Sequence, residues 1–137
     1  MSIMSIYLKE SFDKKISIAM ARGTVVLDEN LFHLTDGLKK LNIRVITPKA
    51  RMSDAQIKHD LLANRILITN NSKDFIRDAS AYDYGIIATE FLQNKDSAYV
   101  VNKIHEAFVD LSLWSKRHGF IVQLKDSGAP EYRELTN

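Results

Sequence analysis

The stretch that decides the fold is "VVLDENL", residues 25–31, where an apolar run meets Asp28, Glu29 and Asn30. The apolar run predicts a buried strand, and Asn30 is a candidate N-cap for the helix after it. Apolar residues of that helix recur at helical spacing, at Leu31, Leu34, Leu38 and Leu41. The question is whether Asp28 only marks the turn between strand and helix or carries chemistry.

Strands and helices alternate along the rest of the chain. Further strands are predicted at 43–46, 65–69, 85–89 and 120–124, and helices from Asp54, after Phe75 and over about 97–117. Strands that are apolar on both faces and separated by helices indicate an α/β fold, with a mostly parallel central sheet flanked by helices. We expect a single domain over residues 24–137 after an N-terminal extension, residues 1–23. The polar tail after the strand at 120–124 is expected to be peripheral.

Composition excludes several classes of protein. The 137 residues are 45% apolar and 26% charged, which is typical of a soluble globular domain. The absence of cysteine excludes disulfides, thiolate zinc sites and thiol nucleophiles. There is no apolar run of membrane-spanning length and no secretory signal pattern, so we expect a cytoplasmic protein. A net charge of +2 does not indicate a dedicated basic nucleic-acid module.

Three acids are expected at one edge of the sheet. In open parallel sheets the ligand site lies beyond the carboxyl ends of the strands. Asp28, Asp54 and Asp74 fall at that edge, with Asn71 beside them, whereas Glu29 should point away because side chains alternate along a strand. Each acid alone is explained as a helix cap or turn residue. Together they would repel one another without a cation, and oxygen ligands suit Mg²⁺ or Mn²⁺.

Basic residues are expected to border the same edge. They are Lys49, Arg51, Lys73 and Arg77. They form either a solvated rim or a surface that neutralises phosphates. The four histidines fall in separate predicted elements, so none is assigned to a metal. Carboxylates with a divalent ion and a basic rim suit phosphodiester hydrolysis.

Two segments carry a resemblance to a known family. "VVLDENL" (25–31) and "MSDAQIKHDLLANRILITNNSKDF" (52–75) resemble PIN-domain proteins, in particular the small PIN-like toxins of bacterial toxin–antitoxin pairs. The residues that match the family motifs are Asp28 to Leu31, Asp54, Thr69 with Asn71, and Asp74 with Phe75. The resemblance covers about residues 24–125 and implies a three-layer αβα fold.

The resemblance implies a metal-dependent endoribonuclease that uses Mg²⁺ or Mn²⁺ to leave a 5′-phosphate and a 3′-hydroxyl. Asp28, Asp54, Asp74 and Asn71 would be the catalytic and metal-binding residues. Asn30 and Thr69 would orient ligands or water, and Lys73 would face a phosphate. The implied partners are an RNA substrate, a cognate antitoxin and a second copy in a homodimer, with no membrane.

The chain also departs from the wider PIN pattern. The usual helical Glu has no clear counterpart, since only Asp36 lies on the first helix, and the loop acid is the amide Asn71. Fewer charges weaken metal binding. The alternative is therefore a catalytically weak or inactive PIN-like module that binds RNA or protein. A phosphatase or receiver-like domain ranks last, because such phosphatases have Asp-x-Asp where this chain has Asp-Glu-Asn.

Overall fold

The computed structural model describes residues 24–48, 52–57, 62, 65–82, 84–112 and 119–135. The predicted extension, residues 1–23, lies outside the described residues. The strands are β1 (Val25–Leu27), β2 (Val45–Ile46), β3 (Ile66–Thr69), β4 (Gly85–Ala88), β5 (Phe120–Gln123) and β6 (Glu131–Glu134). The helices are η1 (Glu29–Leu34), α2 (Thr35–Lys40), α3 (Asp54–Gln56), α4 (Lys73–Tyr82), η3 (Glu90–Leu92) and α5 (Ser97–Ser112), where η1 and η3 are 3₁₀ turns.

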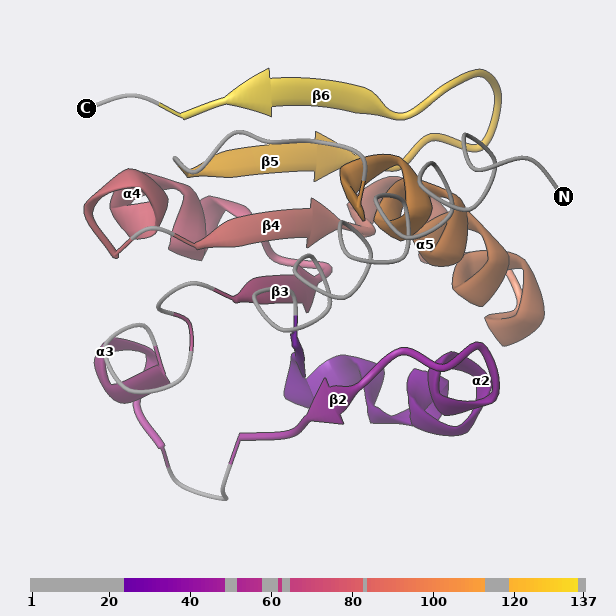
Figure 1. Cartoon of the computed structure of the whole chain (residues 1–137), viewed down its shortest axis with the longest axis horizontal. Coiled ribbons are helices and arrows are strands. Elements are labelled where there is room, and N and C mark those ends of the chain that lie inside the picture. The colour runs from indigo at the N-terminus through magenta and orange to yellow at the C-terminus, as the bar shows by residue number, and fades with distance from the viewer. Residues whose placement is uncertain are drawn as a thin grey trace, which may run out of the picture.

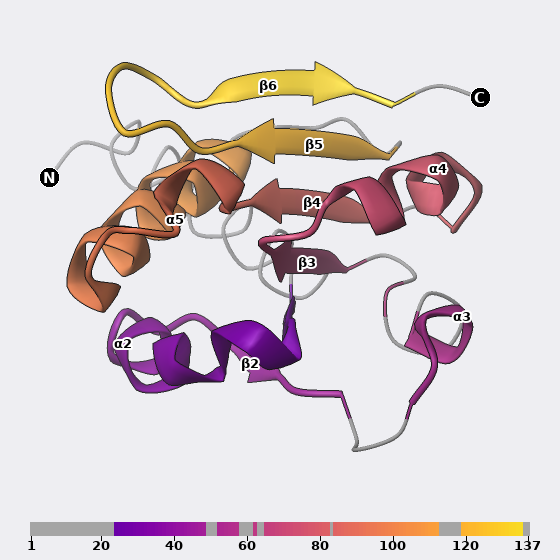
Figure 2. The same ribbon diagram turned by 180° about the vertical axis from the view of Figure 1, so that it is seen from behind.

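The six strands form one sheet in the order β2-β1-β3-β4-β5-β6. All neighbours pair in parallel except β5 and β6, which are antiparallel. Figure 1 shows β3, β4, β5 and β6 stacked above β2, with the arrow of β6 opposite to those of β4 and β5, and Figure 2 shows the same arrangement from behind. The prediction of an α/β fold with a mostly parallel sheet is confirmed.

Apolar side chains cover both faces of the central strands, which is why β1, β3 and β4 contain almost no polar residues. Val25 and Leu27 of β1 belong to one buried cluster, and Val26 between them belongs to a second cluster on the other face. The first cluster includes residues of η1, α2 and α5, and the second includes residues of α4. In Figure 1, α2 and α5 lie to the right of the picture and α3 and α4 to the left.

The helix after β1 begins earlier than the sequence suggests. Asn30 is the second residue of η1, so the prediction that it is an N-cap is wrong. The cap position belongs to Asp28, whose backbone carbonyl accepts the Leu31 N–H at 2.8 Å. The Asp28 side chain makes no capping bond and is left available for another partner.

The end of α2 follows a Schellman arrangement. Asn42 has a φ of +62°, and the N–H of Ile43 reaches back to the Leu38 carbonyl at 3.1 Å. Gly37 within the same helix faces α5, where an added Cβ would come within 2.9 Å of the Val101 side chain. Glycine therefore allows α2 to approach α5 closely.

The starts of the other helices can be compared with the sequence predictions. The start at Asp54 is confirmed and is set by a capping box, in which Ser53 N–H donates to Gln56 Oε1 at 2.9 Å and Gln56 N–H donates to Ser53 Oγ at 3.2 Å. α4 begins at Lys73, before Phe75, and runs for ten residues. α5 is described to Ser112, and the rest of its predicted length lies outside the described residues.

The polar tail after the strand at 120–124 contains a further strand, which the sequence analysis did not predict. Residues 131–134 form β6, which pairs with β5 and is exposed along its whole length. None of the helices in the described part of the chain has the length and apolar character of a membrane-spanning segment.

Candidate functional site

The strand order indicates the edge of the sheet at which a ligand site is expected. From β1 the chain passes outward to β2 and then returns to β3 on the opposite side of β1, so the order reverses between β1 and β3. In open α/β sheets, ligands bind beyond the carboxyl ends of the strands at such a reversal. Asp28 directly follows β1, and Asn70 and Asn71 directly follow β3. The sequence thus places polar residues at the point where a site is expected.

A hydrogen bond joins the two strands at this point. The Thr69 hydroxyl donates to Asp28 Oδ2 at 2.6 Å, and Thr69 is wholly buried whereas Asp28 is half-buried. The backbone supports the same contact, because Asp28 N–H donates to the Ile68 carbonyl at 3.0 Å. Asp28 therefore has a fixed position, with carboxylate lone pairs beyond the one that Thr69 uses.

The hydrogen bonds continue from Thr69 into the start of α4. The Thr69 hydroxyl oxygen accepts the N–H of Asn71 at 3.0 Å, and the Asn71 side-chain amide donates to Asp74 Oδ2. Asn71 is half-buried and Asp74 is exposed. The loop after β3 thus links the two acids through Thr69 and Asn71. Of the residues predicted at this edge, Asp28, Asn71 and Asp74 are thus connected by hydrogen bonds, and the side chain of Asp54 lies outside the described residues.

A further acid, Glu90, joins the same edge. Glu90 is half-buried, and its Oε1 accepts a hydrogen bond from the backbone N–H of Ser72. Glu90 follows β4, and the N–H of the preceding Thr89 bonds to the Thr69 carbonyl at 2.9 Å. Glu90 was not among the predicted site residues. The usable signal was its position, since it directly follows the strand predicted at 85–89 and the carboxyl ends of parallel strands lie at this edge.

The structure gives less information on the other predicted site residues. Asp54 is the first residue of α3, but its side chain lies outside the described residues, as do Lys49 and Arg51. Lys73 and Arg77 are exposed on α4. Asn30 is exposed on η1, and Glu29 beside it is exposed as expected. The structure thus brings Asp28, Thr69, Asn71, Asp74 and Glu90 into one set of contacts.

The acids of this edge have the right chemistry for a divalent ion but do not complete a site. Carboxylate and amide oxygens are the ligands that Mg²⁺ and Mn²⁺ prefer. Within the residues that the structure describes, no three Asp, Glu, His or Cys side chains gather closely enough to hold a metal ion. Asp28, Asp74 and Glu90 each accept a hydrogen bond from a separate protein donor.

A cavity of about 310 Å³ opens at the same edge. Its walls come from η1, from the loop after β3, from the segment after β4 and from the first turn of α5. Asn30, His33, Asn70 and Gln93 supply polar groups, and Leu34 and Leu92 are buried beneath them. The cavity and the acids are therefore built on the same loops.

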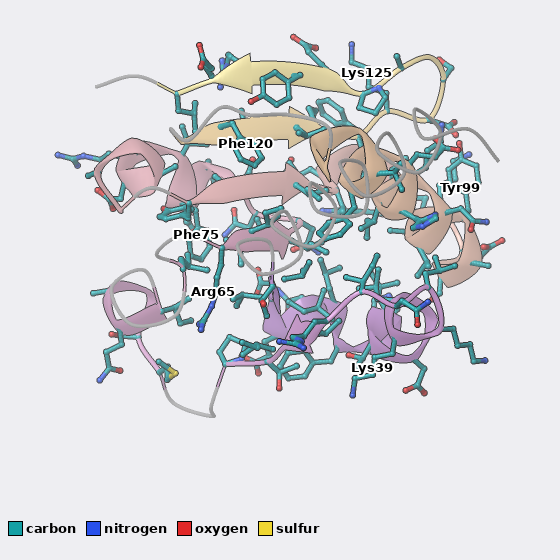
Figure 3. All side chains as sticks on the ribbon, viewed as in Figure 1. Lys39, Arg65, Phe75, Tyr99, Phe120 and Lys125 are labelled. Carbon is teal, nitrogen blue, oxygen red and sulfur yellow. The ribbon has the colours of Figure 1, made fainter. Side chains whose placement is uncertain are left out.

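A second polar cluster lies where α5 begins. Tyr99 donates its hydroxyl to Asp126 Oδ1 at 2.7 Å, and Lys95 Nζ lies 3.1 Å from Asp126 Oδ2. The Tyr99 hydroxyl, followed by Lys95, lowers the pKa of Asp126 below its ordinary value, and the same hydrogen bond raises the pKa of Tyr99. Figure 3 shows Tyr99 and Lys125 toward the right of the picture, where β3, β4 and β5 end.

Comparison with known proteins gives no family assignment. No protein-family model, no curated protein and no solved structure matches this chain.

Proposed function

We propose that this chain is a PIN-like, metal-dependent endoribonuclease that hydrolyses RNA phosphodiester bonds with Mg²⁺ or Mn²⁺. The observation that carries the proposal is the contact between Asp28 and Thr69 at the reversal of strand order. In the loop that follows Thr69, the Asn71 side-chain amide donates to Asp74 and the Ser72 backbone N–H donates to Glu90. Acids held at the carboxyl edge of a parallel sheet are suited to metal-assisted chemistry on a phosphate.

Each residue has a defined part in this proposal. The hydrogen bond from Thr69 would orient Asp28 and leave its remaining oxygen lone pairs for the ion. Asp28 and Asp54 would hold the ion, which would polarise the phosphate and lower the pKa of a bound water. Lys73 and Arg77 are exposed cations on α4 that would neutralise phosphates of the RNA next to the cleaved bond.

Cleavage of RNA by the purified chain tests the proposal. A fluorescent single-stranded RNA should be cut with Mn²⁺ or Mg²⁺ and remain intact with EDTA. Asp28→Asn and Asp54→Asn should each abolish cleavage, because an amide supplies less charge to the ion. Asp36→Asn, at an exposed position of α2, is the matched control and should cut normally. Cleavage that persists in both site variants would overturn the mechanism.

A second candidate function rests on a specific observation. Residue 71 is an amide at a position where the resemblance implies an acid, and the usual helical Glu has no clear counterpart. These departures favour a PIN-like module that binds RNA or protein without cutting. Calorimetric titration with Mn²⁺ separates the two candidates. Saturable binding that disappears in Asp28→Asn supports the nuclease, and absence of binding together with intact RNA supports the module.

The biological setting that we propose is a type II toxin–antitoxin pair. In this setting the chain is the toxin, acts as a homodimer and is blocked by a cognate antitoxin. Expression of the chain alone should arrest bacterial growth, and Asp28→Asn should relieve the arrest. Co-expression of a small adjacent reading frame should also relieve it and should give a complex by size-exclusion chromatography with light scattering. Normal growth with abundant wild-type chain would contradict the toxin assignment.

A further inference from the structure

The cavity at the carboxyl edge has the size of a small ligand site. Its volume is about 310 Å³, at the small end of the range of roughly 300 to 1,000 Å³ for such sites. Leu34 and Leu92, which are almost completely buried, supply an apolar floor. A flat group of modest size with polar edges would satisfy both the floor and the walls.

The polar groups of the wall are mainly neutral. Asn30, Asn70 and Gln93 each offer an amide with both donors and an acceptor, and His33 adds an imidazole. Among the described residues that line this cavity there is no carboxylate. Lys95 also borders it, but its ammonium lies 3.1 Å from Asp126 Oδ2, so its charge is partly balanced. Amide groups that present a donor beside an acceptor match the edges of nucleobases.

The cavity adjoins the acids along the chain. Asn70 lies between Thr69, which bonds to Asp28, and Asn71, which bonds to Asp74. Thr89 lines the cavity and precedes Glu90, whose carboxylate accepts the Ser72 N–H. The cavity and the carboxylates are therefore built on the same segments, which follow β3 and β4.

Two exposed aromatic residues are neighbours in the sequence of residues that line the cavity. Phe32 lies on η1 between Leu31 and His33, and its exposed fraction is 40%. Phe91 lies on η3 next to Leu92, and its exposed fraction is 65%. Exposed aromatic rings serve as stacking surfaces for the bases of single-stranded nucleic acids.

We propose that this cavity binds one unpaired nucleobase of an RNA strand and so selects the bond presented to the acids. The amides of Asn30, Asn70 and Gln93 read the polar edge of the base, and Phe32 and Phe91 stack on bases outside the cavity. This inference rests on the proposed function and adds base selectivity to it. The same base chemistry occurs in free nucleotides, which the experiment separates from RNA.

Binding without cleavage tests the inference. Fluorescence anisotropy in EDTA would measure Kd for hexamers of adenylate, cytidylate and uridylate, and for a uridylate hexamer with one central guanylate. We expect the Kd values of the tightest and the weakest hexamer to differ by about tenfold, because one bidentate amide contact can discriminate between bases by that factor. Gln93→Leu and, separately, His33→Leu should bring this ratio toward one. Asn102→Leu, at an exposed amide of α5, should leave the ratio unchanged.

The stacking residues should behave differently from the amides. Phe91→Ala should weaken all four hexamers to a similar degree, by about tenfold, because stacking accepts every base. Val109→Ala, at an exposed apolar position of α5, is the matched control. Gln93 and Phe91 are both exposed, so neither substitution should prevent folding, which thermal melting would confirm.

The outcomes distinguish this inference from the proposed function. If the wild-type chain cuts RNA and Gln93→Leu keeps the full base preference, the cavity assignment is overturned while the nuclease proposal stands. If the wild-type chain shows the base preference and loses it in Gln93→Leu but never cuts, the cavity assignment holds and the nuclease proposal fails. A mononucleotide that competes as tightly as a hexamer overturns the assignment to RNA, because the site would then belong to a free nucleotide.

Discussion

Thr69 and Asp28 are joined by a hydrogen bond of 2.6 Å from the Thr69 hydroxyl to Asp28 Oδ2. The same hydroxyl accepts the N–H of Asn71 at 3.0 Å. One buried side chain therefore holds both the acid after β1 and the loop after β3. A hydroxyl at this position matters because apolar side chains cannot make either contact.

Removing that hydroxyl should weaken the protein as well as the site. Thr69→Val keeps the shape of the side chain but leaves the Asn71 N–H and one Asp28 oxygen without their partner. We expect a loss of about 1.5 to 3 kcal/mol in the free energy of unfolding, as for hydrogen bonds to charged groups. Urea denaturation measures the loss. Thr69→Ser retains the hydroxyl and is the control, and a Val variant as stable as the Ser variant would contradict this role.

A bound divalent ion should stabilise the folded chain. If Mn²⁺ binds only the folded state, an ion concentration of about 100 times Kd adds about 2.7 kcal/mol to the free energy of unfolding. Thermal melting of the protein with Mn²⁺ and with EDTA measures this change. Asp28→Asn should abolish the stabilisation and Asp36→Asn should preserve it. Equal stabilisation of all three proteins would place the ion elsewhere.

Gly85 of β4 should not tolerate a larger side chain. A Cβ at this position would overlap the ring of Phe120 on β5, and that ring stacks on Tyr132 of β6 at a centroid distance of 5.8 Å. Figure 3 labels Phe120, the first residue of β5. We expect Gly85→Ala to lower the free energy of unfolding by about 1 to 3 kcal/mol, as overpacking does. Chemical denaturation measures the loss.

The origin of that loss can be verified with a second substitution. Phe120→Leu in the Gly85→Ala background should recover part of the stability, because the smaller side chain makes room for the methyl group. Gly128→Ala is an informative comparison. Nothing lies within 4 Å of a Cβ there, but its φ is +85°, so a loss there would arise from backbone strain alone. A Gly85→Ala protein that is not rescued by Phe120→Leu would contradict the packing account.

The contact between Asp126 and Tyr99 should make stability depend on pH. The pKa of Asp126 is lower in the folded chain than its ordinary value of 3.8. The stabilisation is therefore complete above the ordinary aspartate pKa and is lost as pH falls through the lower, folded-state pKa. Asp126→Asn should lower the melting temperature near neutral pH, and its difference from the wild type should close below about pH 4. A difference that is the same at neutral and acidic pH would contradict the ionic origin.

The parallel part of the sheet could be predicted because its signal is local. Each residue of β1, β3 and β4 is buried, so the strands appear in the sequence as short apolar runs bounded by polar residues. The same rule misses β6. Its four residues are all exposed, and it is held by backbone pairing to β5 and by the stack of Tyr132 on Phe120, both of which depend on the folded sheet.

Part of the candidate site could also be predicted from the sequence. Asp28, Asn71 and Asp74 could be assigned to one edge because each follows a predicted strand or begins a helix. Glu90 was not included, because its contact with Ser72 depends on the pairing of β3 with β4, which sets Thr69 opposite Ala88. Asn30 was expected to cap the helix, but it is the second residue of η1 and lines the neighbouring cavity.

The long separation of Asp28 and Thr69 along the chain has a consequence for folding. The two residues are 41 positions apart, so their bond closes a large loop, whereas α4 and α5 form from local contacts. We expect helical signal to return early in refolding and the carboxyl edge to assemble with the central sheet. Stopped-flow circular dichroism compared with recovery of RNA binding would measure the delay. Any activity of this edge then requires the complete fold, so an incomplete chain emerging from the ribosome would lack that activity.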